Sequence, residues 1–158
     1  MNAPIGGIRL SPDGTRAAAS VNAGGNADVW LFDTRRVAEQ RLTRELGSDT
    51  SPAWLSNERI AYSCDRNVCT HATDGSTGRQ VIMEGPVHVV GSTSDGARVV
   101  VSQSGATSLS DIFVTGTPVG TERASPLKSV IATDRQQRRS DVSPDGKYIV
   151  VANQNGKL

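Results

Sequence analysis

The sequence contains no long apolar run, few aromatic side chains and no excess of charge of either sign. No stretch approaches the roughly 20 apolar residues of a membrane-spanning helix, and the opening MNAPIGGIRL lacks the basic region and apolar run of a secretory signal. Lys and Arg number 17 against 16 Asp and Glu, so no global field draws the chain to nucleic acid or to an anionic membrane. We therefore expect no membrane insertion and no nucleic-acid partner.

Catalytic signatures are also absent. The sequence has no G-x-S-x-G nucleophile elbow, no P-loop, no G-x-G-x-x-G and no H-E-x-x-H. His71 and His88 are its two histidines, so a Ser-His-Asp arrangement would have to assemble by chance on distant strands. These absences predict a protein that is not an enzyme and uses no cofactor.

Turn-forming residues are abundant, and they repeat. The chain has 16 Gly and 7 Pro, which suits short strands joined by tight turns and disfavours a large helical core. A Ser-Pro-Asp-Gly turn occurs at 11–14 and again at 143–146, with degenerate copies LSNE at 55–58 and TSDG at 93–96. The equivalent positions 13, 57, 95 and 145 are separated by 44, 38 and 50 residues. This mean period of about 44 residues is typical of a four-stranded β-propeller blade.

Each turn is expected to join two antiparallel strands, because Pro fixes φ at the second position and Asp and Gly tolerate the backbone that follows. The turn residues that we assign are Ser11, Pro12, Asp13, Gly14, Asp95, Gly96, Ser143, Pro144, Asp145 and Gly146. An apolar run follows each turn (RAAAS, RIAYS, RVVVS and YIVVA), and third strands are expected at DVWLFD, NVCTHATDG and DIFVTG. Weaker fourth strands are expected around QRLT, QVIM and RASPL, as suits the outer edges of blades.

The sequence therefore predicts an all-β fold, a single partial propeller over 1–158 with four-stranded antiparallel blades stacked radially. The expected blades cover approximately 4–46, 47–85 and 86–132, and a half blade covers 133–158. An open arc exposes the apolar faces of its terminal blades. We expect either a longer natural protein or two copies that complete one another by dimerisation as a C2 pair.

A helix is the competing prediction for one segment. In DTRRVAEQRLTRELGSD, Val37, Ala38, Leu42 and Leu46 fall near a helical spacing, with GSD as a stop signal. The spacing is loose, and the segment aligns better with a connection between a third and a fourth strand. We therefore expect strand and loop there.

The repeat units resemble those of TolB-like β-propellers, also called WD-like propeller repeats. The phrases that carry the resemblance are LSPDG, DVWLFDTRRVAEQRLT, DTSPAWLSNERIAYS and DVSPDGKYIVVA, and it extends over nearly the whole chain. The family includes periplasmic proteins, the propeller domains of prolyl-oligopeptidase-type peptidases and modules that follow some bacterial kinase or winged-helix domains. Since closed members have six or more blades, the resemblance implies that about half a ring is present.

Residue by residue, the resemblance makes Trp54 the aromatic that precedes a turn and Asp28 and Asp111 the residues that open third strands. Asn67 takes that place in the second blade. The second turn lacks Pro, Asp and Gly, and the third has Ser94 where Pro is usual, so these two blades are expected to have distorted loops.

Propellers act mainly as binding platforms, because their innermost strands converge on a channel and the loops at one mouth lie close together. The innermost strands are expected at GIRL, TSPAW, PVHVVGS and RQQRRSDV. Arg9, His88, Arg138 and Arg139 are then the candidate binding residues at the channel or its rim. The alternative, that they are solvated charges at strand ends, stays open.

Cys64 and Cys69 flank DRNV at the tip of a predicted hairpin, a spacing that brings their Cβ atoms close enough for a disulfide. Free thiols would also pack there, and the closed loop is too short for a large entropic stabilisation. The sequence leaves both states open. A bridge would indicate an oxidising compartment, and on this ground an extracytoplasmic, periplasmic location is favoured.

Metal sites are poorly supported by the spacing of potential ligands. The Asp-Gly turns and ADVW offer oxygen ligands for Ca²⁺, but they are far apart and lack the dense Asp/Asn ladder of a calcium loop. Cys64, Cys69 and His71 share a hairpin, yet no second pair has zinc-ligand spacing. We expect no metal and interpret His71 as an ordinary blade residue.

The main functional hypothesis is a non-enzymatic propeller module that binds a protein or peptide at its channel mouth or blade edges, with self-association. The first alternative is a propeller piece of a prolyl-oligopeptidase-type peptidase or of a larger bacterial regulator. The second is a structural half-propeller whose homodimer closes the ring.

Overall fold

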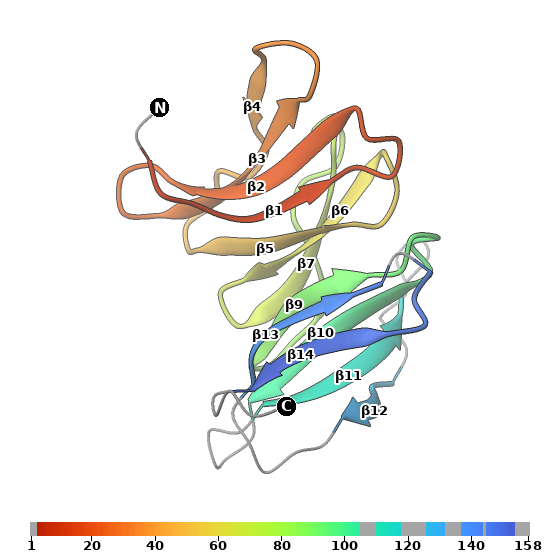
Figure 1. Cartoon of the computed structure of the whole chain (residues 1–158). Helices are drawn as coiled ribbons and strands as arrows, with labels where there is room; N and C mark the ends of the chain where they lie inside the picture. The colour runs from red at the N-terminus through yellow and green to blue at the C-terminus, as the bar shows by residue number, and fades with distance from the viewer. Residues whose placement is uncertain (1–2, 105–109, 118–125, 132–136, 144, 154–158) are drawn as a thin grey trace.

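The computed structural model of the chain describes residues 3–104, 110–117, 126–131, 137–143 and 145–153. Within this part every regular element is a β-strand, and the strands form three four-stranded antiparallel sheets and one two-stranded sheet (Figure 1). The all-β propeller fold predicted from the sequence, three blades and a half blade, is therefore confirmed.

The strands of each sheet follow one another in chain order, from an inner to an outer strand. The first sheet comprises β1 (Ile5–Leu10), β2 (Arg16–Asn22), β3 (Ala27–Asp33) and β4 (Glu39–Arg41), and the second β5 (Asp49–Trp54), β6 (Arg59–Cys64), β7 (Asn67–Ala72) and β8 (Gln80–Met83). The third comprises β9 (Val87–Ser92), β10 (Arg98–Ser104), β11 (Ser110–Gly116) and β12 (Lys128–Ile131), and the half blade β13 (Gln137–Val142) and β14 (Ile149–Asn153).

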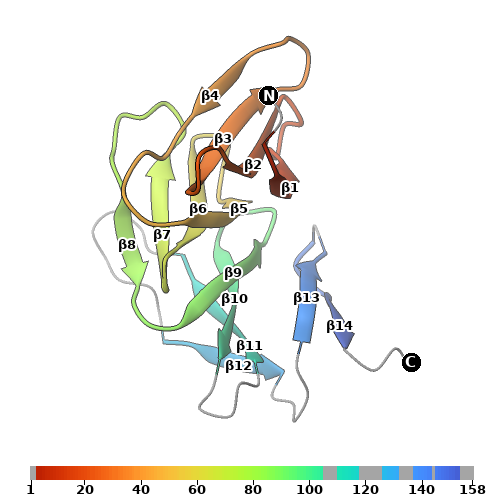
Figure 2. The same cartoon turned by 90° about the vertical axis from the view of Figure 1, so that its left-hand side faces the viewer.

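The sheets stack as an arc, and Figure 2 shows β5 and β9 between β1 and the β13–β14 pair. Side chains alternate between the two faces of each strand, so a central sheet contributes to two cores. In β6, Ile60 and Tyr62 pack toward the first sheet, with Val29 and Leu31. Ala61, on the opposite face, belongs to the core that the second sheet shares with the third. This double burial explains why β6 reads as a nearly continuous apolar run.

The segment 35–46 forms strand and loop, as the sequence predicted, and not the competing helix. It contains β4, and the side chains of Val37 and Leu46 point to solvent with exposed fractions of 110% and 94%. A helical apolar stripe would have needed a sheet to cover it. One detail differs from the prediction. The fourth strand of the third blade lies at β12 rather than around RASPL, a few residues further along the chain. Among the described residues there is no helix that could cross a membrane.

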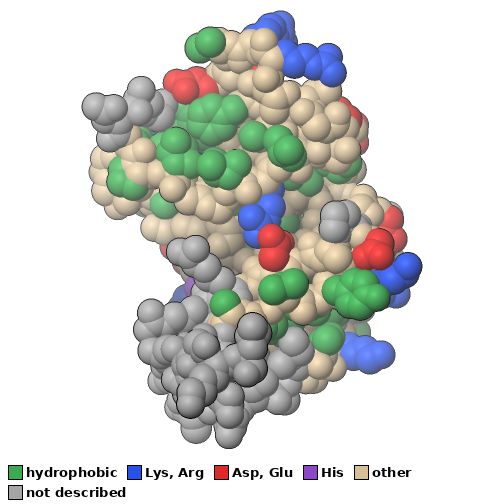
Figure 3. Space-filling model, viewed as in Figure 1, with side chains coloured by type: hydrophobic (Ala, Val, Ile, Leu, Met, Phe, Trp, Pro, Cys, Tyr) green, Lys and Arg blue, Asp and Glu red, His purple; other side chains and the backbone are tan. Residues whose placement is uncertain are grey.

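The two ends of the arc expose apolar side chains. On β1, the exposed fractions of Ile5, Ile8 and Leu10 are 53%, 60% and 64%, and at β14 Tyr148 and Val150 are each 69% exposed. Figure 3 shows apolar side chains gathered over the first sheet and over the half blade on the same side of the molecule. Such faces are buried between blades elsewhere in this chain, so the arc is left with two uncovered sheet faces.

Candidate binding hollow at the inner strands

The inner strands β1, β5, β9 and β13 together line a hollow of about 880 Å³. Its walls include Arg9 from β1, Ser51 and Pro52 from β5, His88 from β9 and Asp141 from β13. A second hollow of about 480 Å³ lies at the ends of the same strands, next to the turns that begin at Ser11 and Thr93. The converging inner strands therefore form a concave, partly polar surface, to which Ser102 of β10 and Val150 and Ala152 of β14 also contribute.

Each inner strand is interrupted by an irregularity of the β-bulge type. The pairing register shifts between Gly6 and Arg9 in β1 and between Thr50 and Ala53 in β5. In β9 the shift lies opposite Val100 and Val101 of the paired strand β10, and in β13 it lies between Gln137 and Arg139. Bulges bend a strand and re-aim its side chains, and they are common beside binding sites. In this chain they bring irregular backbone to the wall of the hollow.

The bulges of the first two sheets lie against each other. Gly7 has φ 60° and Ser51 has φ 52°, and a Cβ on Gly7 would lie 3.4 Å from Pro52 Cδ. A positive φ is uncommon for a non-glycine residue, and a residue before proline normally has an extended conformation. Ser51 departs from both preferences, and such strain is often retained at functional sites.

An ion pair joins the first and last inner strands. Arg9 Nη2 lies 3.3 Å from Asp141 Oδ1, and Arg9 Nη1 donates to the carbonyl oxygen of Ile8 at 3.1 Å. Asp141 Oδ1 also accepts from the backbone N–H of Val142 at 2.9 Å. Because Arg9 and Asp141 contribute to both hollows, the pair stands between them. Figure 3 shows a basic and an acidic side chain side by side in the waist between the first sheet and the half blade.

The structure brings two of the four predicted rim residues into the hollow. Arg9 and His88 both line it, and the His88 side chain is exposed. Arg138 and Arg139 lie in β13, as the sequence predicted, but their side chains are outside the described residues. Asp141, Ser51 and the bulges were missed, because an ion pair across the arc has no signal in the local sequence.

The Ser-Pro-Asp-Gly turns are stabilised by their own side chains. The Ser11 hydroxyl donates to Asp13 Oδ1 at 2.7 Å and the Thr15 backbone N–H donates to it at 3.0 Å, and these bonds lower the pKa of Asp13 to about 2. Ser143 and Lys147 hold Asp145 in the same way. Thr93 takes the Ser position beside Asp95 in the third turn. Pro144, assigned to the last turn, lies outside the described residues.

Trp54 connects the first two sheets and also lines the second hollow. Its side chain is buried, its indole Nε1 donates to the Arg9 carbonyl oxygen at 2.9 Å, and the Arg16 guanidinium lies 5.2 Å from its ring centroid. The Arg16 guanidinium also donates to the Asn57 carbonyl oxygen. The aromatic that precedes the second turn is therefore an inter-blade contact.

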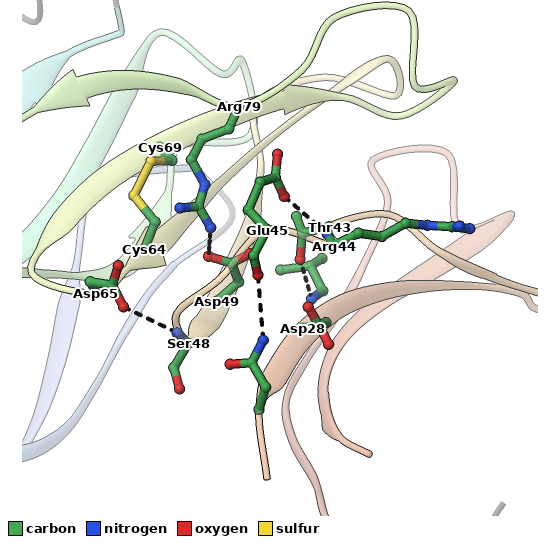
Figure 4. A network of polar contacts seen from close by, with 12 residues as sticks. Asp28, Thr43, Arg44, Glu45, Ser48, Asp49, Cys64, Asp65, Cys69 and Arg79 are labelled. Carbon is green, nitrogen blue, oxygen red and sulfur yellow. Dashed lines mark hydrogen bonds and ion pairs between the residues drawn. A yellow bond between two sulfur atoms is a disulfide. The ribbon is translucent and has the colours of Figure 1, made fainter. Parts of the chain in front are cut away.

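A buried polar network lies where the first and second sheets meet (Figure 4). Arg79 Nη2 lies 2.6 Å from Asp49 Oδ1, and Arg41 Nη2 lies 2.7 Å from Asp28 Oδ2, with both carboxylates almost fully buried. Burial raises the pKa of Asp49 despite the opposing effect of neighbouring Thr43 and Arg79. Asp28 thus opens its strand as the resemblance implied, whereas the pair of Asp49 and Arg79 had no local signal in the sequence.

The hairpin between β6 and β7 carries a disulfide. Cys64 and Cys69 are bonded, with their Cα atoms 5.9 Å apart and both side chains buried. They are diagonal rather than directly opposite, since Cys64 pairs with Asn67 and Cys69 with Tyr62. At the hairpin tip, Asp65 accepts a hydrogen bond from the Ser48 backbone N–H at 3.1 Å. The bridged hairpin is thereby tied to the connection between the first two sheets.

No cluster in the described part of the chain fits a metal ion. No group of three or more His, Cys, Asp or Glu side chains there could hold a metal. His71 is buried, with its Nδ1 2.9 Å from the Ala72 carbonyl oxygen, so its ring is positioned inside the blade. The hollow at the inner strands remains the candidate site.

This fold defines a β-propeller, here three blades and half of a fourth, with a hollow at the inner strands. Over part of the chain the sequence is similar to that of TolB, in agreement with the resemblance seen in the repeat units. No family model matches the sequence. The Tol-Pal system protein TolB of Anaeromyxobacter sp. (strain K) is 38% identical over 50 residues, which cover 32% of this chain and 11% of that protein.

Solved structures show the same fold over almost the entire chain. A putative TolB from Agrobacterium tumefaciens matches with a TM-score of 0.78 and 16% identity over 98% of this chain and 56% of its own. TolB from Acinetobacter baumannii matches with a TM-score of 0.74 and 15% identity, over 98% of this chain and 39% of its own. A prolyl endopeptidase matches with a TM-score of 0.58 and 22% identity, over 98% and 26%. This chain therefore spans about half or less of these proteins.

Proposed function

We propose that this chain is a non-enzymatic propeller module that binds an extended segment of a protein or peptide in the hollow at its inner strands. The observation that carries the proposal is the Arg9–Asp141 pair, placed between two hollows of about 880 and 480 Å³. Volumes of roughly 300–1,000 Å³ are usual for ligand sites. The likeness to TolB supports a protein partner, and the catalytic signatures that would indicate an enzyme are absent from the sequence.

Arg9 is the residue that we assign to the ligand, with His88 beside it. The pair with Asp141 is a single contact of 3.3 Å between partly exposed side chains, and exposed pairs of this kind contribute little to stability. A carboxylate on the ligand that takes both guanidinium edges would replace it with a charge-assisted, two-point contact. Arg138 and Arg139 are proposed as further rim residues on the last inner strand.

The test is selection of random linear peptides displayed on phage against the whole chain, followed by affinity measurement on purified variants. Selected peptides should contain an acidic residue and should bind Arg9→Gln at least about tenfold more weakly, a loss of 1.4 kcal/mol. Arg36→Gln is the matched control, because Arg36 is an exposed arginine that pairs only with neighbouring Asp33 on the outer part of the first sheet. Peptides that bind Arg9→Gln as well as the wild-type chain would contradict the assignment.

A second candidate function, self-association, is favoured by the apolar faces at the two ends of the arc. Ile8 and Leu10 at one end and Tyr148 and Val150 at the other are all more than half exposed. Apolar patches of this kind commonly mark protein interfaces. Light scattering over a wide concentration range tests the proposal, which predicts a mass above that of one chain.

A role as the propeller of a peptidase is the third candidate, and the likeness to a prolyl endopeptidase favours it. In that case the hollow would face a hydrolase domain. An in-frame G-x-S-x-G segment elsewhere in the same gene would support this role. We further propose an extracytoplasmic, oxidising location on the basis of the Cys64–Cys69 disulfide.

A further inference from the structure

The last glycine of the turn motif contacts the turn of the preceding sheet in the third sheet and in the half blade. Gly96 and Gly146 have φ 66° and 68°, and each lies against the first turn residue of the preceding sheet. A Cβ on Gly96 would overlap the Leu55 carbonyl oxygen, and a Cβ on Gly146 would lie 2.6 Å from Thr93 Cγ2. At both junctions the space for a side chain is therefore taken by the neighbouring turn.

Gly14 is the equivalent glycine in the turn of the first sheet, and among the described residues no neighbouring turn lies against it. Its φ is 69°, and a Cβ there would meet nothing within 4 Å. The turn has the same internal hydrogen bond, from the Gly14 backbone N–H to the Ser11 carbonyl oxygen at 2.9 Å, as Gly146 makes to Ser143 at 2.8 Å. The turn of the first sheet therefore has the backbone conformation that contacts a preceding turn in the later sheets, but no equivalent turn in the described part of the chain lies within 4 Å of a Cβ at Gly14.

The end of each inner strand repeats the same arrangement. Trp54, the last residue of β5, is buried against the first sheet and donates to the Arg9 carbonyl oxygen. Ser92, the last residue of β9, donates through Oγ to the Trp54 carbonyl oxygen at 2.6 Å. Leu10 occupies this position in β1, where it is 64% exposed. Leu10 thus occupies the position from which Trp54 and Ser92 contact the preceding sheet.

The complementary surface is present at the other end of the chain. In the repeat, Ser143 is equivalent to Leu55 and Thr93, the residues that lie against Gly96 and Gly146. The half blade also exposes Tyr148 and Val150, and Val150 lines the hollow opposite Ile8 of the first sheet. By this equivalence, the Ser143 turn in the half blade of one copy would fit against Gly14 in the first sheet of another copy.

We propose that the first sheet docks the half blade of a second copy of this chain, head to tail. The Ser143 turn of one copy lies against Gly14 of the other, and Leu10 and Ile8 are covered by the partner's half blade. This proposal rests on the proposed self-association and names its surface. The contact is heterologous, joining two different faces, so it leaves a matching pair of faces for a further contact or for ring closure.

Gly14→Ala tests the contact, and Gly75→Ala is its matched control. Gly75 has φ 76° and also meets nothing within 4 Å, so both substitutions impose the same backbone strain and neither creates a clash within one chain. The association constant measured by light scattering or analytical ultracentrifugation should fall about tenfold or more for Gly14→Ala, as overpacking of a close contact typically causes. Gly75→Ala should associate like the wild-type chain.

A second pair of variants addresses the apolar part of the surface. Leu10→Glu should abolish self-association, whereas Val37→Glu should not, because Val37 is fully exposed on the connection between β3 and β4. A wild-type chain that stays monomeric at every concentration would overturn both self-association and this proposal, leaving the face to a different polypeptide. Self-association that survives Gly14→Ala and Leu10→Glu would overturn this surface alone. Because Ile8 and Leu10 also line the two hollows, peptide binding is judged separately, from the affinity of Arg9→Gln for the selected peptides.

Discussion

The carboxylates of Asp13 and Asp49 have pKa values shifted in opposite directions, although both residues lie in short polar stretches of the sequence. Asp13 is fully exposed, yet hydrogen bonds from Ser11 and Thr15 hold its pKa down. Asp49 is buried at the start of an inner strand, and loss of hydration raises its pKa even though Arg79 pairs with it. Turn chemistry is local and could be read from Ser-Pro-Asp-Gly, whereas burial depends on how two sheets meet.

Ser11→Ala should raise the pKa of Asp13 from about 2 toward its ordinary value of 3.8, because the Ser11 hydroxyl makes the largest contribution to the shift. A carboxyl with a lower pKa in the folded than in the unfolded chain stabilises the fold above pH ~4, and this contribution is lost as pH falls toward about 2. The pKa of Asp95 and of Asp145 is also lowered. Carbon-detected NMR titration of Asp13 in the wild-type chain and in Ser11→Ala measures the effect. An unchanged pKa in Ser11→Ala would contradict the assigned cause.

At the scale of the strands, the sequence predicted the first three strands of each full blade closely and the outer ones less well. The second strand of a blade carries a buried apolar run between strong turn signals, as β2 shows between Gly14 and the glycines that follow it. Outer strands such as β12 pair along one edge only and make few buried contacts, so their composition carries little information. The β-bulges of the inner strands were not predicted, because no residue type alone demands them.

The disulfide hairpin between β6 and β7 leads to a prediction at the same scale. Replacing both Cys64 and Cys69 by Ala should lower the free energy of unfolding by about 2 kcal/mol, the size expected for closure of so short a loop. The strand ladder from Arg59↔Ala72 to Cys64↔Asn67 does not depend on the bridge, so the β-sheet signal in far-ultraviolet circular dichroism should persist. Denaturant unfolding of the double variant gives the difference. Loss of the folded baseline would show that the bridge is needed for the hairpin to form.

At the scale of the whole molecule, the sheets of the arc pack on one another, and in the part of the chain that the structure describes the partly exposed pair of Arg9 and Asp141 links its first and last inner strands. Asp141→Asn should therefore lower the free energy of unfolding by no more than about 1 kcal/mol, although the pair joins residues 132 positions apart. Thermal unfolding with and without added salt measures this contribution. A larger loss would mean that the pair closes the arc and does not merely stand in the hollow.

The repeat, the blade size, the turn chemistry and the all-β class could be predicted from local sequence, because strand alternation and turn residues are properties of neighbouring positions. The folded chain was needed to show that Arg9 meets Asp141, that Arg79 meets Asp49, that Trp54 is an inter-sheet contact, and that Gly14 has no neighbour within 4 Å of the position that a Cβ would take. These features arise where sheets distant in the chain come together. Their formation depends on stacking geometry, which a local pattern does not encode.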